Sequence, residues 1–245
     1  MNDLLGEDQR FDVDKALQFL GTSRSRFLQY AGEWLTDFGD PVDVLMMLAS
    51  ETGQAVGPWE SARLCCLLGL SPSSSVLSLL EDVLDEPVSG EPRPPISAAM
   101  AVAHAKDVLH EKEAQYAREL VLALDAGRAN TQVSPCLIDA ALLSICHGQG
   151  AYPEAAVETA ATRSLLGYLD DFPHFSTTIL EAALLSSQQE LIEKSIRVLG
   201  THQQESGNVP GQETHVIRQG FITLRAVALF KRIGKQEVEG PPPRD

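Results

Sequence analysis

The stretch from Ser134 to Leu166 decides the fold, and its first half reads Ile138-Asp139-Ala140-Ala141-Leu142-Leu143-Ser144. Forty-two residues later the chain reads Leu180-Glu181-Ala182-Ala183-Leu184-Leu185-Ser186. Forty-two residues earlier it reads Ile96-Ser97-Ala98-Ala99-Met100-Ala101-Val102, a looser version with its small and apolar residues in register. Recurrence at a fixed period predicts repeated structural units, and the small residues favour closely packed helices.

A period near forty residues is typical of helical hairpins in the size range of HEAT and armadillo repeats. The second helix of each hairpin is predicted at 112–126, 153–167 and 188–199. We therefore predict an all-α fold of stacked antiparallel helical hairpins, a HEAT- or TPR-like α-solenoid of about 10–12 helices. The turn Gly150-Ala151-Tyr152-Pro153-Glu154-Ala155 resembles the turn of a tetratricopeptide repeat, which implies a helical hairpin at this point.

Capping signals before the repeats predict five shorter helices. Asp12 can cap a helix that Gly21 ends, and Ser23 is predicted to start a second helix that Gly39 closes. The next three helices begin with a small or capping residue followed by proline, a pattern typical of the first helical turn. They are predicted at about 41–52, 58–69 and 73–85.

A proline-rich segment separates the two halves of the chain. Residues 86–95 contain four prolines, which exclude a helix and favour an exposed linker or loop. A final helix is predicted at about 213–234. The predicted organisation is an N-terminal helical subdomain (1–86), a linker or loop (87–95), a helical-repeat region with a period near 42 (96–235) and a disordered tail (236–245).

The composition is acidic, with 34 acidic residues against 19 basic ones and a net charge of −15. Residues 1–95 alone carry 16 acids and 6 bases. Such a field repels phosphate groups, which disfavours general binding to nucleic acids or anionic membranes. The sequence contains no run of 18 apolar residues, so no membrane span is predicted. Residues 1–8 lack the pattern of a signal peptide.

The four cysteines, at positions 65, 66, 136 and 146, show no zinc-binding spacing. We interpret them as free thiols in a reducing compartment, so the predicted location is intracellular, in the cytoplasm or the nucleus. His104, Asp107 and Glu111 share one helix face, but a metal site would need a fourth ligand from elsewhere. No nucleotide-binding, hydrolase or metalloprotease motif occurs. No catalytic residue, metal or cofactor is therefore predicted.

The preferred function is a non-catalytic scaffold or adaptor for protein–protein interaction, as a subunit of a larger complex, because helical arrays offer extended surfaces. Homo-oligomerisation stays open. The final helix offers a candidate surface, since Val216 to Lys235 contains five bases and no acid. Three alternatives are open: stabilisation of the helix end by its dipole, pairing with this protein's own acidic half, and docking of an acidic partner. The docking hypothesis assigns partner binding to Arg218, Arg225, Lys231 and Arg232.

A second possibility is a DNA-binding regulator, because residues 16–31 look like a helix-turn-helix. In that motif Ser23, Arg24 and Arg26 would face the major groove at the start of the recognition helix. The net charge of −10 over residues 1–95 weighs against it. A helical regulatory subunit of an enzyme is a further alternative.

Overall fold

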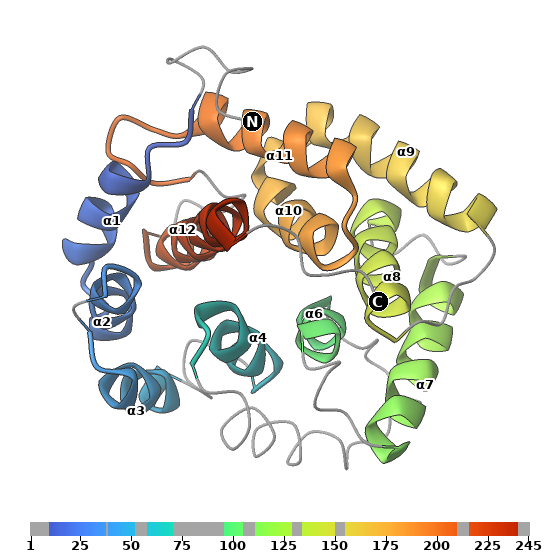
Figure 1. The fold of residues 1–245 in the computed structure, drawn as a ribbon, viewed down its shortest axis with the longest axis horizontal. Helices are drawn as coiled ribbons and strands as arrows, with labels where there is room; N and C mark the ends of the chain where they lie inside the picture. The colour runs from blue at the N-terminus through green and yellow to red at the C-terminus, as the bar shows by residue number, and fades with distance from the viewer. Residues whose placement is uncertain are drawn as a thin grey trace.

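The computed structural model describes residues 10–37, 39–51, 58–70, 96–104, 111–128, 134–149, 155–209 and 216–239. Across these ranges the chain forms eleven α-helices, one short 3-10 helix and no strand, so the predicted all-α class is confirmed. Figure 1 shows the arrangement of the helices. Within the same ranges every helix is too short or too polar to cross a lipid bilayer.

The N-terminal helices are α1 (Val13–Gly21), α2 (Arg26–Leu35), α3 (Pro41–Glu51) and α4 (Pro58–Leu68). The first begins as predicted, because the side chain of Asp12 accepts a hydrogen bond from the Lys15 backbone N–H at 3.0 Å. Proline occupies the first position of both α3 and α4, also as predicted. The helix predicted at 73–85 lies outside the described residues.

The start and end of α2 differ from the prediction. The side chain of Ser25, rather than that of Ser23, caps the helix by accepting from the Leu28 N–H. The Ser23 hydroxyl instead accepts from the Ser25 N–H, so it holds the turn before the helix. The helix ends at Leu35, and Asp37 takes a left-handed conformation with φ of 63°. The chain therefore turns before Gly39 is reached.

Three helices lie side by side with α4 in an inner row (Figure 1): α6 (Ile96–His104), α8 (Pro135–Gln149) and α10 (Ser176–Leu185). Most of the described residues of these helices are buried, including Ala140, Ala141, Ala182 and Ala183, each with no exposed surface. Small side chains at these positions let neighbouring helices approach closely, which explains the uniform apolar character of the three stretches.

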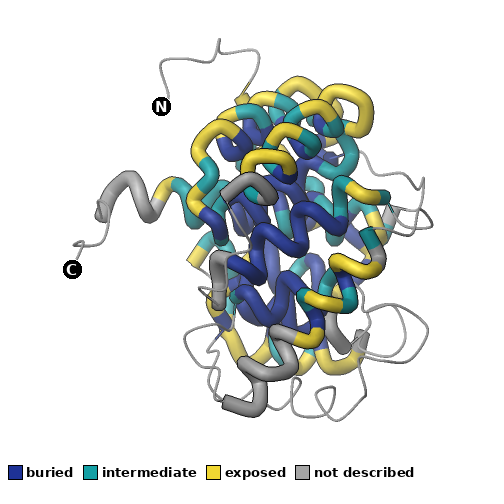
Figure 2. The backbone as a smooth tube through the Cα atoms, turned by 90° about the vertical axis from the view of Figure 1, so that its right-hand side faces the viewer, coloured by how far each residue is buried: buried dark blue, intermediate teal, exposed yellow. Residues whose placement is uncertain are grey.

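An outer set of helices covers this row. It consists of α7 (Glu111–Arg128) and α9 (Ala155–Asp171), which pack on α8, and α11 (Gln189–His202), which packs on α9 and α10. The short 3-10 helix η3 (Pro173–Phe175) joins α9 to α10. Figure 2 shows that exposed residues concentrate on these outer helices, whereas the inner ones are buried.

The last described helix, α12 (Val216–Glu239), packs against the helices at the start of the chain. It contacts α1, α2, α4 and α10, and these helices enclose it in Figure 1. Stacked ring pairs mark the contact: Phe11 with Phe230 at 4.5 Å, and Phe27 with Phe221 at 5.6 Å between ring centroids. The apolar core therefore runs continuously from the first helix to the last.

The predicted division at 87–95 lies outside the described residues. Packing between α4 and α6, and between α12 and both α1 and α2, nevertheless joins segments on either side of it. The final helix extends to Glu239, beyond its predicted end at 234. The rest of the predicted tail, from residue 240, is also outside the described ranges.

Candidate functional site

Two charged residues lie inside otherwise apolar helices, Arg63 on α4 and Glu181 on α10. Their side chains are 4% and 0% exposed. Burying an unpaired charge costs several kcal/mol or more, so each residue needs a partner of opposite charge. The inner row places these two helices so that the two side chains meet.

Arg63 and Glu181 form a forked pair. The Nε of Arg63 donates to both carboxylate oxygens of Glu181 at 3.0 Å, and Nη2 donates to Oε2 at 2.5 Å. The remaining Nη1 donates to Oε2 of Glu60, one helical turn earlier on α4, at 3.2 Å. Such planar pairing is the strongest geometry available to a guanidinium and a carboxylate. Burial by itself would raise the pKa of Glu181, but Arg63 and the hydrogen bond with His104 hold that pKa well below its usual range.

His104, the last residue of α6, extends the pair towards α12. Its Nε2 lies 2.8 Å from Oε1 of Glu181, and its Nδ1 lies 3.4 Å from Nη1 of Arg232. Because a guanidinium only donates, Nδ1 acts as the acceptor and Nε2 carries the hydrogen that Glu181 accepts. Burial lowers the pKa of His104 despite the nearby carboxylate. The ring is therefore neutral at neutral pH.

Two arginines of α12 complete the arrangement. Nη1 of Arg225 donates to Oε1 of Glu60 at 3.2 Å, and Nη2 of Arg232 donates to the backbone carbonyl of Cys66. We call the whole set the interhelix ion cluster, which comprises Glu60, Arg63, His104, Glu181, Arg225 and Arg232. It joins α4, α6, α10 and α12 at the centre of the fold.

The centre of the interhelix ion cluster is closed to solvent. The side chains of Arg63, His104 and Glu181 are at most 4% exposed, so a substrate could reach them only if the helices separated. The two glutamates offset two of the three arginine charges, and the histidine is neutral, so the cluster keeps one net positive charge. The cluster thus fixes how α12 sits on the inner row.

The four predicted docking residues have different positions in this geometry. Arg225 and Arg232 contribute to the interhelix ion cluster. The contact of Arg225 with Glu60 matches the alternative of pairing with the protein's own acidic half, whereas Arg232 contacts His104 and the Cys66 carbonyl. Arg218 is exposed and Lys231 is half-buried. The docking role of these four residues stays a prediction. The sequence analysis does not single out Glu181 or Arg63, although Glu181 is the one charge within the apolar helix α10, which is a readable signal.

The predicted DNA-contacting residues lie around the start of α2. Ser23 is buried, whereas Arg24 and Arg26 are exposed. Only the two arginines are therefore accessible on the surface, whereas the serine is not. DNA binding stays an untested alternative. Of the predicted metal candidates, Asp107 and the side chain of Glu111 lie outside the described residues, and His104 faces Glu181. Among the described side chains, no three His, Cys, Asp or Glu groups are close enough to hold a metal ion.

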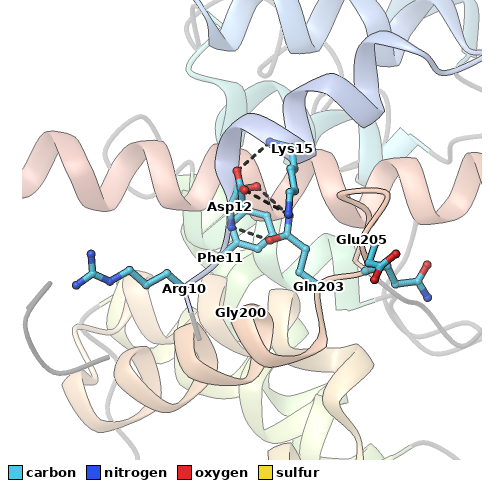
Figure 3. A pocket seen from close by; sticks show the side chains of 8 residues that line it. Arg10, Phe11, Asp12, Lys15, Gly200, Gln203 and Glu205 are labelled. Carbon is cyan, nitrogen blue, oxygen red and sulfur yellow. Dashed lines mark hydrogen bonds and ion pairs between the residues drawn. The ribbon is translucent and has the colours of Figure 1, made fainter. Parts of the chain in front are cut away.

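A polar cavity of about 470 Å³ lies between the start of α1 and the end of α11 (Figure 3). Gln203 crosses it as a clamp: its Oε1 accepts from the Asp12 N–H at 2.6 Å, and its Nε2 donates to the Asp12 carbonyl at 2.8 Å. Arg10, Lys15 and Glu205 also line it, so charges of both signs face the space. The mixed charge favours no one class of ligand.

The cysteines are free thiols. Burial raises the pKa of Cys65 to about 11, that of Cys66 to about 12 and that of Cys146 to about 11. A thiol reacts as its thiolate, so these three groups are poor nucleophiles at neutral pH. Cys136 is half-buried, and its Sγ lies 3.3 Å from Oγ of Ser164.

Large apolar side chains are exposed at four described positions: Val42 (58%), Met46 (59%), Leu122 (70%) and Phe172 (40%). The first two share α3, whereas Leu122 is on α7 and Phe172 follows α9. Isolated exposed apolar residues are normal on a protein surface, but two on one helix face define a small patch.

Comparison of the chain with models of known protein families, with curated proteins and with solved structures found no match.

Proposed function

We propose that this protein is a non-catalytic scaffold or adaptor for protein–protein interaction, built on stacked helical hairpins. The observation that carries the proposal is the equivalence of residues forty-two positions apart in the inner row. Ser144 and Ser186 are both buried, and each hydroxyl donates to the carbonyl four residues earlier, at 2.9 and 2.7 Å. Matching residues in matching roles support a structural repeat.

The acidic residues of the repeat also correspond. Asp139 on α8 and Glu181 on α10 are both buried, and each pairs with an arginine of another helix. Nε of Arg128 lies 3.1 Å from Oδ1 of Asp139. In both units the charge serves packing between helices, which is the expected use in an array whose core forms between neighbours.

An array of this kind binds partners through its outer faces, because its inner helices are buried in the core. Exposed apolar side chains lie on α3, at Val42 and Met46, and on α7, at Leu122. The buried Arg63, His104 and Glu181, in contrast, are committed to internal pairs. Together these features favour a binding protein over a catalyst.

The test is recovery and reconstitution of a partner. The full chain with an affinity tag is used for capture from cells, followed by mass spectrometry and mixing of the purified components. The proposal expects one protein that binds at a fixed stoichiometry in size-exclusion chromatography with light scattering. Recovery of nucleic acid alone would favour the DNA-binding alternative and overturn the proposal. Turnover of a small substrate by the purified chain would overturn it as well.

A further inference from the structure

The surface of α3 that faces away from the core is apolar. Val44 and Leu48 are buried against the rest of the protein. Val42 and Met46 lie on the opposite side of the helix, and the exposed Ala49 continues the same line one turn later. A helix on a protein surface ordinarily presents polar residues there.

Acidic residues are exposed at the start of α3 and on the neighbouring α2 segment. Asp40 and Asp43 are exposed at the start of α3, and Glu33 and Asp37 are exposed on or just after α2, which packs on α3. Between Arg26 and Arg63 the sequence contains six acids and no base. One of these six acids, Glu60, pairs with Arg63 and Arg225, but the segment as a whole is acidic. An apolar strip beside acidic residues is complementary to a surface that is apolar in the middle and basic at its edges.

We propose that the α3 face, defined by Val42, Met46, Ala49, Asp40 and Asp43, binds a basic amphipathic helix of a partner protein. The inference rests on the proposed function and names its site and the chemistry of its partner. Helices of this kind dock through apolar residues at three- and four-residue spacing, which matches the spacing on α3. Methionine suits such a contact because its flexible side chain adapts to the partner's shape.

A second copy of this chain is a weaker candidate for the occupant. The basic amphipathic helix of this chain is α12, and its apolar residues Leu224 and Val227 are buried in the core. Its residues Arg225 and Arg232 are already committed to the interhelix ion cluster. Among the described helices, the basic amphipathic one is thus already packed in the fold, so the occupant that we propose belongs to another protein.

The test uses a synthetic amphipathic helix of leucine and lysine with a fluorophore, titrated with the full chain and followed by anisotropy. A matched helix of leucine and glutamate is the charge control. The double variant V42S/M46S should weaken binding of the lysine peptide at least about tenfold. Leu122→Ser, which removes a more exposed apolar side chain from α7, should leave the affinity unchanged.

The charge contribution is tested separately with D40N/D43N. Asparagine is chosen because the Asp40 side chain accepts from the Val42 N–H at 2.8 Å, and asparagine caps a helix equally well. This variant should weaken binding of the lysine peptide at low salt and match the wild type at high salt. Melting curves of all variants check that the fold is retained.

Three results would overturn the inference: no binding of the lysine peptide, equal binding of the glutamate peptide, or unchanged affinity of V42S/M46S. Partner capture tests the proposed scaffold function separately from the α3 site. If the wild type and V42S/M46S recover the same protein at the same stoichiometry, the scaffold stands and the α3 site is wrong. If neither captures a protein, the scaffold itself is wrong.

Discussion

Replacing Glu181 with alanine should destabilise the protein by about 3–5 kcal/mol, the typical loss when one partner of a buried ion pair is removed. The structure places this residue at the upper end of that range. The carboxylate has no exposed surface and accepts three contacts from Arg63 and one from His104. Without it, the buried guanidinium keeps only the more exposed Glu60. For a chain of this size the melting temperature should fall by roughly 6–20 °C.

The assay is thermal and urea unfolding followed by circular dichroism. Asp170→Ala is the matched control, because Asp170 pairs with Lys194 at 2.7 Å but its side chain is 66% exposed. A surface pair contributes about 0–1 kcal/mol, so this control should melt close to the wild type. The double variant R63M/E181L should recover much of the loss, since apolar replacement of a buried pair is often neutral. The reasoning is refuted if E181A and D170A melt at the same temperature.

Three other perturbations test separate features of the fold. The difference in stability between the wild type and His104→Gln should shrink as the pH falls from 7 to 5. Because the pKa of His104 is lowered in the folded state, the unfolded chain binds the proton first, and the wild type loses stability as the pH falls. Urea titrations measure this loss, which is at most about 1.4 kcal/mol per pH unit. Ala141→Leu should overpack a site with no exposed surface and cost about 1–3 kcal/mol, and an unchanged melting temperature would contradict that packing. Thr223→Val should cost about 1–3 kcal/mol, because the buried Thr223 hydroxyl accepts from the Val209 N–H at 3.0 Å. The exposed Thr201→Val serves as its control, and equal losses from both would argue against the buried bond.

Local features of the fold were predictable because their causes lie within a few residues. The cap at Asp12 and the prolines that open α3 and α4 act on the adjacent backbone, and the structure confirms them. The cap of α2 was assigned to the wrong serine. Ser23 and Ser25 are both good capping residues, and only the contacts of the folded turn decide between them.

The partners in the interhelix ion cluster could not be predicted from the sequence. The sequence shows that Arg225 and Arg232 belong to a basic final helix, but it carries no information on what that helix packs against. Arg225 meets Glu60 across 165 residues of chain, and Arg63 meets Glu181 across 118. Pairings at such separations depend on the packing of whole helices, which periodicity does not encode.

The enclosure of α12 has a consequence for synthesis of the protein on the ribosome. Helices α1, α2 and α4 are made early, yet the surfaces they bury against α12 stay uncovered until that last helix emerges. At about 5–20 residues per second, the interval between α4 and α12 is roughly 8–30 s. During it, Phe11 and Phe27 lack the rings on which they finally stack. The nascent chain therefore exposes an apolar surface for many seconds, and molecular chaperones bind surfaces of this kind.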